Sequence, residues 1–106
     1  MITLTKIDNS NKTIIEINRE KLDVLNMKAL KENMTKIVAD GNINLLINLK
    51  QVTFIDSSGL SVLISLFKQL KTLEGSLELS GLNEQPSELL EITQLDKIFT
   101  ISEECN

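Results

Sequence analysis

Histidine is absent from these 106 residues, and cysteine occurs only once, at Cys105. Without an imidazole the chain has no Ser-His-Asp or Cys-His catalytic pair, no histidine metal ligand and no phosphohistidine. A lone cysteine also excludes an internal disulfide and a cysteine-based metal cage. We therefore expect no metal, no cofactor and no catalytic residue of these common kinds.

Aromatic and basic residues are also few. Three Phe residues with no Trp or Tyr indicate a core of aliphatic side chains. Eleven basic residues against fifteen acidic ones give a formal net charge of -4, which repels a phosphate backbone and argues against nucleic-acid binding. No apolar stretch approaches the roughly 20 residues that span a bilayer, and no secretory leader is evident. We expect a cytoplasmic protein without a membrane partner.

Hydrophobic periodicity predicts an alternation of strands and helices. Strand patterns at 2–5 and 13–17 flank the polar stretch 8–11, which predicts a hairpin. Apolar residues at steps of three and four predict helices over 26–40 and from Leu60 to Leu73, closed by Gly41 and Gly75. Further strands are expected at 43–47, 52–55, 76–80 and 98–101, and a third helix at 87–92 with Pro86 in its first turn.

This order of elements predicts a single α/β domain over residues 1–106. After the antiparallel hairpin, strands that alternate with helices should pair in parallel through right-handed crossovers. We expect a mixed, mostly parallel β-sheet of four to five strands with helices packed against it. No surplus apolar face requires a permanent oligomer, so a monomer or a weak dimer is expected.

The most informative segment is 54–60, FIDSSGL, where polar residues separate a strand from a helix. In one interpretation it is only a helix cap: Asp56, Ser57 or Ser58 accepts hydrogen bonds from the first helical N–H groups, and Gly59 permits the turn. In the other, a serine hydroxyl at this helix N-terminus accepts a phosphate, which would meet unpaired N–H groups and the positive dipole end. Phosphorylation would add about 1.5 to 2 negative charges beside Asp56 and weaken a partner docked there.

The segments 46–49, LINL, and 52–60, VTFIDSSGL, resemble the signature of the STAS family of anti-sigma factor antagonists. The resemblance implies a bacterial partner-switching protein that binds an anti-sigma factor, often also a serine kinase, and thereby releases the sigma factor. It implies phosphorylation at Ser58, directly before the glycine, which ends binding until a metal-dependent serine phosphatase removes the phosphate. Ser57 is the less favoured acceptor.

The resemblance also implies a partner surface. It consists of the turn with the start of the following helix, and of the loop before the first helix: Asp56, Ser57, Ser58, Gly59, Leu60 and Ser61, together with Leu22, Asp23 and Val24.

Two functions other than a phosphorylation-controlled antagonist are compatible with parts of the sequence. A STAS domain can serve as a constitutive adaptor in another signalling or lipid-transport complex, in which case Ser58 is never phosphorylated. An enzyme would have to pair Asp56 with Ser57 as a hydrolytic couple, but no third group is visible that would activate the serine. The four glycines form no nucleotide-binding loop motif. A binding protein is therefore favoured over an enzyme.

Overall fold

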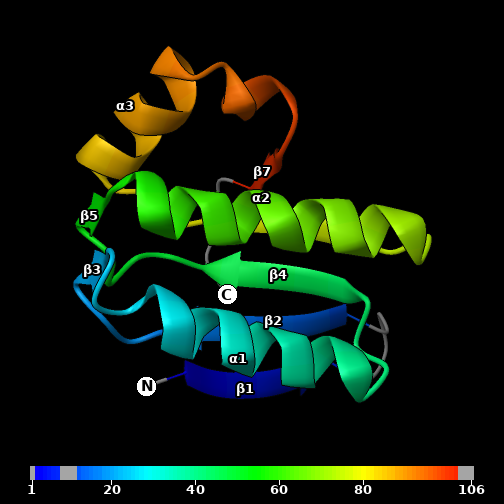
Figure 1. Cartoon of the computed structure of the whole chain (residues 1–106). Helices are drawn as coiled ribbons and strands as arrows, with labels where there is room; N and C mark the ends of the chain where they lie inside the picture. The colour runs from blue at the N-terminus through cyan, green and yellow to red at the C-terminus, as the bar shows by residue number, and fades with distance from the viewer. Residues whose placement is uncertain (1, 8–11, 103–106) are drawn as a thin grey trace.

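The computed structural model describes residues 2–7 and 12–102, in which strands alternate with helices (Figure 1). The expected hairpin is present, and its connection at 8–11 lies outside the described residues. In chain order the elements are β1 (Ile2–Ile7), β2 (Lys12–Ile17), β3 (Lys21–Leu22), α1 (Met27–Ala39), β4 (Asn44–Asn48), β5 (Phe54–Ile55), α2 (Ser57–Thr72), β6 (Ser76–Ser80), α3 (Glu84–Ile92), the 3-10 turn η1 (Leu95–Lys97) and β7 (Thr100–Ser102).

The main sheet has five strands in the order β1-β2-β4-β6-β7. Among these described strands, β1 and β2 pair in an antiparallel manner, and every later pair is parallel. Helices α1 and α2 lie side by side in front of this sheet (Figure 1). Helix α3 lies above the N-terminal end of α2 in the same view. The predicted mixed, mostly parallel sheet with helices packed against it is confirmed.

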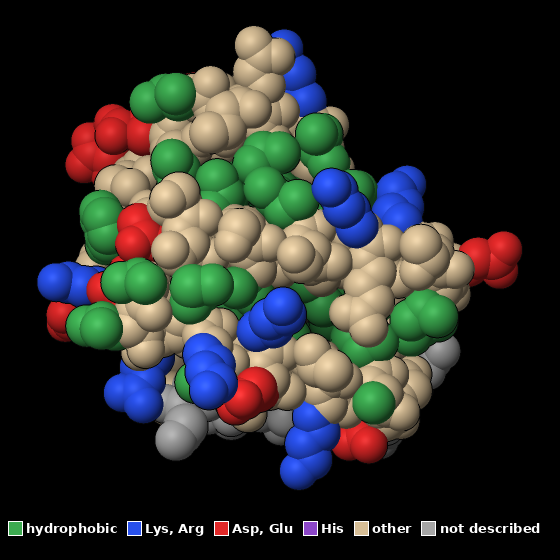
Figure 2. Space-filling model, in the orientation of Figure 1, with side chains coloured by type: hydrophobic (Ala, Val, Ile, Leu, Met, Phe, Trp, Pro, Cys, Tyr) green, Lys and Arg blue, Asp and Glu red, His purple; other side chains and the backbone are tan. Residues whose placement is uncertain are grey.

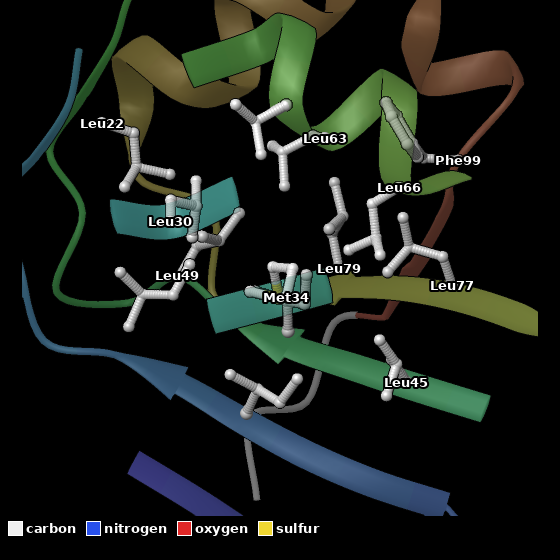
Figure 3. Close-up of a cluster of buried hydrophobic side chains, with 14 of the residues drawn as sticks. Leu22, Leu30, Met34, Leu45, Leu49, Leu63, Leu66, Leu77, Leu79 and Phe99 are labelled. Carbon is white, nitrogen blue, oxygen red and sulfur yellow. The ribbon is translucent and has the colours of Figure 1, made fainter. Parts of the chain in front are cut away.

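Alternation along the strands places the core between the sheet and the helices. Ile15, Ile47 and Leu79 share one register row on the helix-facing side, and all three are fully buried. Figure 3 shows how side chains of α1 and α2 close over this face. The core is aliphatic as predicted, apart from Phe99, whose ring meets that of Phe67 edge to face at 5.4 Å. Burial of this kind is the main favourable term in folding.

The helix ends agree only partly with the predictions. Gly41 closes α1 with a φ of 98°, and its N–H donates to the carbonyl of Val38 at 2.9 Å. The prediction for the end of α2 is wrong in one respect, because the left-handed residue there is Glu74, with a φ of 61°. Gly75 has another use: a Cβ at that position would lie 2.1 Å from the carbonyl oxygen of Ile43.

Several element boundaries also differ from the predictions; the last strand, for example, is β7 at Thr100–Ser102 where 98–101 was expected. Helix α2 begins at Ser57 and α3 at Glu84, each three residues earlier than expected, although Pro86 does lie in the first turn of α3. The strand expected at 52–55 shortens to the two residues of β5, which lie outside the main sheet and pair in parallel with β3. Strand β3 itself was not predicted, because a two-residue strand has no periodicity to detect.

Among residues 2–7 and 12–102, no helix combines the length and apolar character that a membrane span requires.

Candidate functional site

The turn from β5 into α2 lies at the edge of the sheet where β4 and β6 end, on the left in Figure 1. In open α/β sheets, the carboxyl ends of parallel strands are the usual place for ligands and partners. The segment 54–60, which the sequence marked as the most informative, therefore lies at the end of the sheet where α/β proteins usually carry their functional loops.

Asp56 caps helix α2. Its backbone is extended, with φ -101° and ψ -175°, and its Oδ1 accepts hydrogen bonds from the N–H groups of Ser58, at 2.8 Å, and Gly59, at 3.0 Å. These are two of the N–H groups that no helical carbonyl can reach. Of the three capping residues that the sequence left open, the structure assigns the role to Asp56.

The Asp56 cap engages backbone N–H groups and neither of the hydroxyls of Ser57 and Ser58. Ser57 and Ser61 are exposed and Ser58 is partly buried. The Ser61 hydroxyl donates to the carbonyl of Ser58 at 2.8 Å, whereas no hydrogen bond links the Ser58 hydroxyl to another residue of the described chain. A phosphate on Ser58 would find two of the nearby N–H groups already held by Asp56. The expectation that it meets unpaired N–H groups is therefore only partly met, and the carboxylate is a close negative neighbour.

Gly59 is where the helix and the small sheet touch. A Cβ at this position would lie 2.3 Å from the carbonyl oxygen of Leu22 and 2.8 Å from the Cβ of Leu22. That carbonyl also accepts a hydrogen bond from the N–H of Asp56 at 3.1 Å. Glycine is thus required for close approach, and the contact ties the start of α2 to β3.

The loop before α1 is the second part of the predicted partner surface. Asp23 organises it: its Oδ1 accepts from the N–H of Leu25 at 3.1 Å, and its carbonyl accepts from the N–H groups of Asn26 and Met27 at 3.0 and 2.9 Å. This turn presents Val24 and Leu25 to solvent, with 63% and 86% of their surfaces exposed. Asp23 therefore serves as a turn former, and its neighbours carry the apolar surface.

The predicted partner residues divide into two groups. Leu22, Gly59 and Leu60 are buried, and they hold the turn and the loop together. The side chains that reach the surface, fully or in part, are Asp23, Val24, Asp56, Ser57, Ser58 and Ser61.

Two apolar residues outside the predicted partner residues extend this surface. Leu25 follows Val24, and Phe54 in β5 is 40% exposed and pairs in register with Lys21 of β3. Figure 2 shows hydrophobic side chains gathered on the left of the molecule, where β3 and β5 lie in Figure 1. In the sequence, Leu25 lies just before the helical periodicity begins, and this position was the only indication of its exposure.

Helix α3 holds the segment that leads into the turn. The Gln85 amide accepts from the N–H of Ile55 at 2.9 Å and donates to the carbonyl of Ile55 at 3.0 Å. The Asn83 amide donates to the carbonyls of Lys50 and Val52 at 2.9 and 2.8 Å. Nothing in the sequence pointed to either residue, because both contacts join positions about thirty residues apart.

The site has little of what hydrolytic or metal chemistry needs. The one carboxylate beside the serines is already engaged with backbone N–H groups as a cap. In the part of the chain that the structure describes, no three His, Cys, Asp or Glu side chains lie close enough to share a metal ion.

Removing the Asp56 cap should lower stability. We expect Asp56→Ala to reduce the free energy of unfolding by about 1 kcal/mol, whereas Asp56→Asn should stay close to wild type, because Asn ranks with Asp at this helix position. Urea denaturation followed by far-ultraviolet circular dichroism measures both. An unchanged midpoint for Asp56→Ala would contradict the capping role.

Comparison with known proteins agrees with this geometry. Residues 2–106 match the model of the STAS domain family. An anti-sigma-B factor antagonist of Bacillus subtilis is 37% identical over 93 residues, which cover 87% of this chain and 84% of that protein.

Solved structures share the fold. The crystal structure of an anti-sigma factor antagonist from Mycobacterium paratuberculosis superposes with a TM-score of 0.81, at 24% identity, over 98% of this chain and 87% of that one. The phosphorylated form of the Bacillus cell fate determinant SpoIIAA gives a TM-score of 0.72 at 15% identity, over 98% and 93% of the two chains. The resemblance seen in the sequence is confirmed: the chain belongs to the STAS-domain family of anti-sigma factor antagonists.

Proposed function

We propose that this protein is an anti-sigma factor antagonist controlled by phosphorylation of Ser58. In the unphosphorylated state it binds an anti-sigma factor that is also a serine kinase, and the sigma factor is released. Phosphorylation ends the complex, and a metal-dependent serine phosphatase restores it. The exchange takes place in the cytoplasm, where sigma factors act, and the antagonist itself catalyses no reaction.

The observation that carries this proposal is the position of Ser58. Ser58 lies in the first turn of α2, directly before Gly59, whose contact with Leu22 joins the turn to the exposed Val24–Leu25 loop. The backbone around it is fixed by the Asp56 cap and by the contact with Leu22, so a phosphate would change the surface without any need to refold it.

The same geometry supports the direction of the switch. A phosphate on Ser58 would add about 1.5 to 2 negative charges beside the Asp56 carboxylate. A partner that docks here would have to remove both groups from water, and an uncompensated buried charge costs several kcal/mol. Phosphorylation should therefore oppose binding.

We call the exposed residues Val24, Leu25 and Phe54 the apolar rim of the site, and we propose that they supply contact energy for the partner. They lie on adjoining segments, since β3 pairs with β5 and leads directly into the Val24–Leu25 turn. A few such anchors usually dominate the energy of an interface. Leu22 and Leu60, which are buried, act indirectly by supporting the rim and the turn.

The rim gives a direct test of the surface. Leu25→Asp should weaken the complex with the anti-sigma factor at least tenfold, because it places a charge at an apolar contact. Since Leu25 is 86% exposed, the melting temperature should change little. Titration calorimetry measures the affinity, and Ile92→Asp at the end of α3, where Ile92 is 80% exposed, is the matched control. Equal weakening by both variants would argue against a rim-centred interface.

The experiment that tests the proposal uses a purified serine kinase of the anti-sigma class and ATP. Intact mass spectrometry should show the addition of one phosphate to the wild-type protein and none to Ser58→Ala. Phosphate addition should reduce complex formation in a pull-down. Tight binding that is indifferent to ATP, with no added mass, would instead make the protein a constitutive adaptor.

A further inference from the structure

We propose that Gln85 is a positioning residue for the turn from β5 into α2, which carries Ser58. Helix α3 would then take part in the control of binding by phosphorylation, although no residue of α3 was predicted to do so. The inference rests on the proposed function for its effect on phosphorylation, but its structural part concerns the free protein. It starts from the two hydrogen bonds that join Gln85 to the main chain of Ile55.

Strand β5 is short and has a strand neighbour on one side only. The N–H groups of Phe54 and Asp56 donate to the carbonyls of Glu20 and Leu22, at 3.2 and 3.1 Å. Alternation along a strand turns the N–H and C=O of Ile55 the other way. There the Gln85 amide accepts from one and donates to the other, at 2.9 and 3.0 Å. A single side chain thus takes the place that a neighbouring strand would occupy.

The local environment makes these bonds important. Ile55 is 1% exposed, and a buried main-chain group that loses its hydrogen-bond partner is left with the uncompensated cost of its removal from water. The Asn83 amide, at the N-cap of α3, donates to the carbonyls of Lys50 and Val52. The start of α3 therefore holds the segment before the turn at three residues, Lys50, Val52 and Ile55.

Ile55 also directly precedes the cap. Its C=O belongs to the peptide unit that carries the N–H of Asp56, and the carboxylate of Asp56 holds the N–H groups of Ser58 and Gly59. Without the hydrogen bonds to Gln85, the peptide unit between Ile55 and Asp56 is held only by the hydrogen bond from the Asp56 N–H to the Leu22 carbonyl. The position of Ser58 should then become less defined, and both the kinase and the binding partner would meet a looser turn.

Amide hydrogen exchange on the free, unphosphorylated protein tests this without any partner. Gln85→Met keeps the approximate side-chain volume and removes both hydrogen bonds, whereas Gln85→Glu can only accept. Glu88→Met, at an exposed position of the same helix, is the matched control. In Gln85→Met we expect the amides of Ile55, Ser58 and Gly59 to exchange at least tenfold faster, while the sheet amides of Leu45, Ile47 and Leu79 keep the wild-type rates.

With a serine kinase of the anti-sigma class, kcat/KM for phosphorylation of Ser58 should fall about tenfold in Gln85→Met and stay unchanged in Glu88→Met. Faster exchange at Ile55 alone, with Ser58 and Gly59 as in wild type, would overturn the proposal and leave Gln85 as an attachment of α3.

Should Gln85→Met lose its global fold, Gln85→Glu takes its place: it keeps the acceptor for the Ile55 N–H and loses the donor to the Ile55 carbonyl. Faster exchange of the Ser58 and Gly59 amides in Gln85→Glu would then support the proposal, and wild-type rates at both would overturn it. If no kinase phosphorylates the wild-type protein, the proposed function fails, and the exchange rates still decide the role of Gln85.

Discussion

Replacing Ser58 with Asp should weaken binding of the anti-sigma factor by about a hundred- to a thousandfold, whereas Ser58→Ala should bind like the wild type. The carboxylate introduced by Ser58→Asp would lie beside that of Asp56, and a docked partner would have to desolvate both. An uncompensated buried charge costs several kcal/mol, and each 1.4 kcal/mol is about tenfold in affinity. Surface plasmon resonance with the immobilised anti-sigma factor measures the three dissociation constants.

The variant should remain folded, because an acidic side chain in the first turn of a helix interacts favourably with the helix dipole. Ser65→Asp is the control: it adds the same charge to an exposed position further along α2, and we expect less than a threefold change in affinity. If Ser65→Asp weakened binding as strongly as Ser58→Asp, the effect would come from net charge on a protein that already carries -4.

Gly59→Ala should destabilise the protein by about 2 to 3 kcal/mol, although helix propensity alone predicts a gain of up to about 1 kcal/mol. The added Cβ would lie 2.3 Å from the Leu22 carbonyl oxygen, and a backbone atom cannot turn aside as a flexible side chain can. Relief requires β3 to move away from α2, which stretches the 3.1 Å hydrogen bond between Asp56 and Leu22. Urea denaturation gives the stability change.

Gly75→Ala is the matched comparison for this substitution. Its Cβ would lie 2.1 Å from the Ile43 carbonyl oxygen, so it should cost a similar amount of stability, but at the opposite end of α2. We expect Gly59→Ala to lose at least a further tenfold in partner affinity at temperatures where both variants are folded. A Gly59→Ala protein that binds as well as Gly75→Ala would show that the spacing of β3 and α2 does not shape the partner surface.

The main sheet and the two long helices were predictable because each has a periodicity that local sequence records. Leu77 and Leu79 alternate with the less buried Ser76 and Glu78, and Leu63, Leu66 and Leu70 recur at helical steps. The boundaries were less predictable. Helix α2 begins at Ser57 because the Asp56 side chain supplies the first acceptors, and the sequence offered three residues that were able to do so.

The site was predictable to the extent that it is local. The turn at 56–61 has a recognisable pattern, and resemblance to a family joined it to the loop at 22–24. The close approach of Gly59 to Leu22 and the bonds from Gln85 to Ile55 depend on the packing of elements distant in sequence. Such contacts carry no local signal, because a glycine at a turn and a glutamine in a helix each have an ordinary use of their own.

The strand order β1-β2-β4-β6-β7 follows the order of synthesis. Each new strand of the main sheet is added beside the previous one, so no strand has to insert between two that have already paired. A nascent chain can therefore extend the sheet in one direction as it leaves the ribosome, each new strand pairing with the main-sheet strand that was synthesised before it. Because α3 follows β6 in the chain, the Gln85 contact can form only after every strand of the main sheet except β7 has been synthesised.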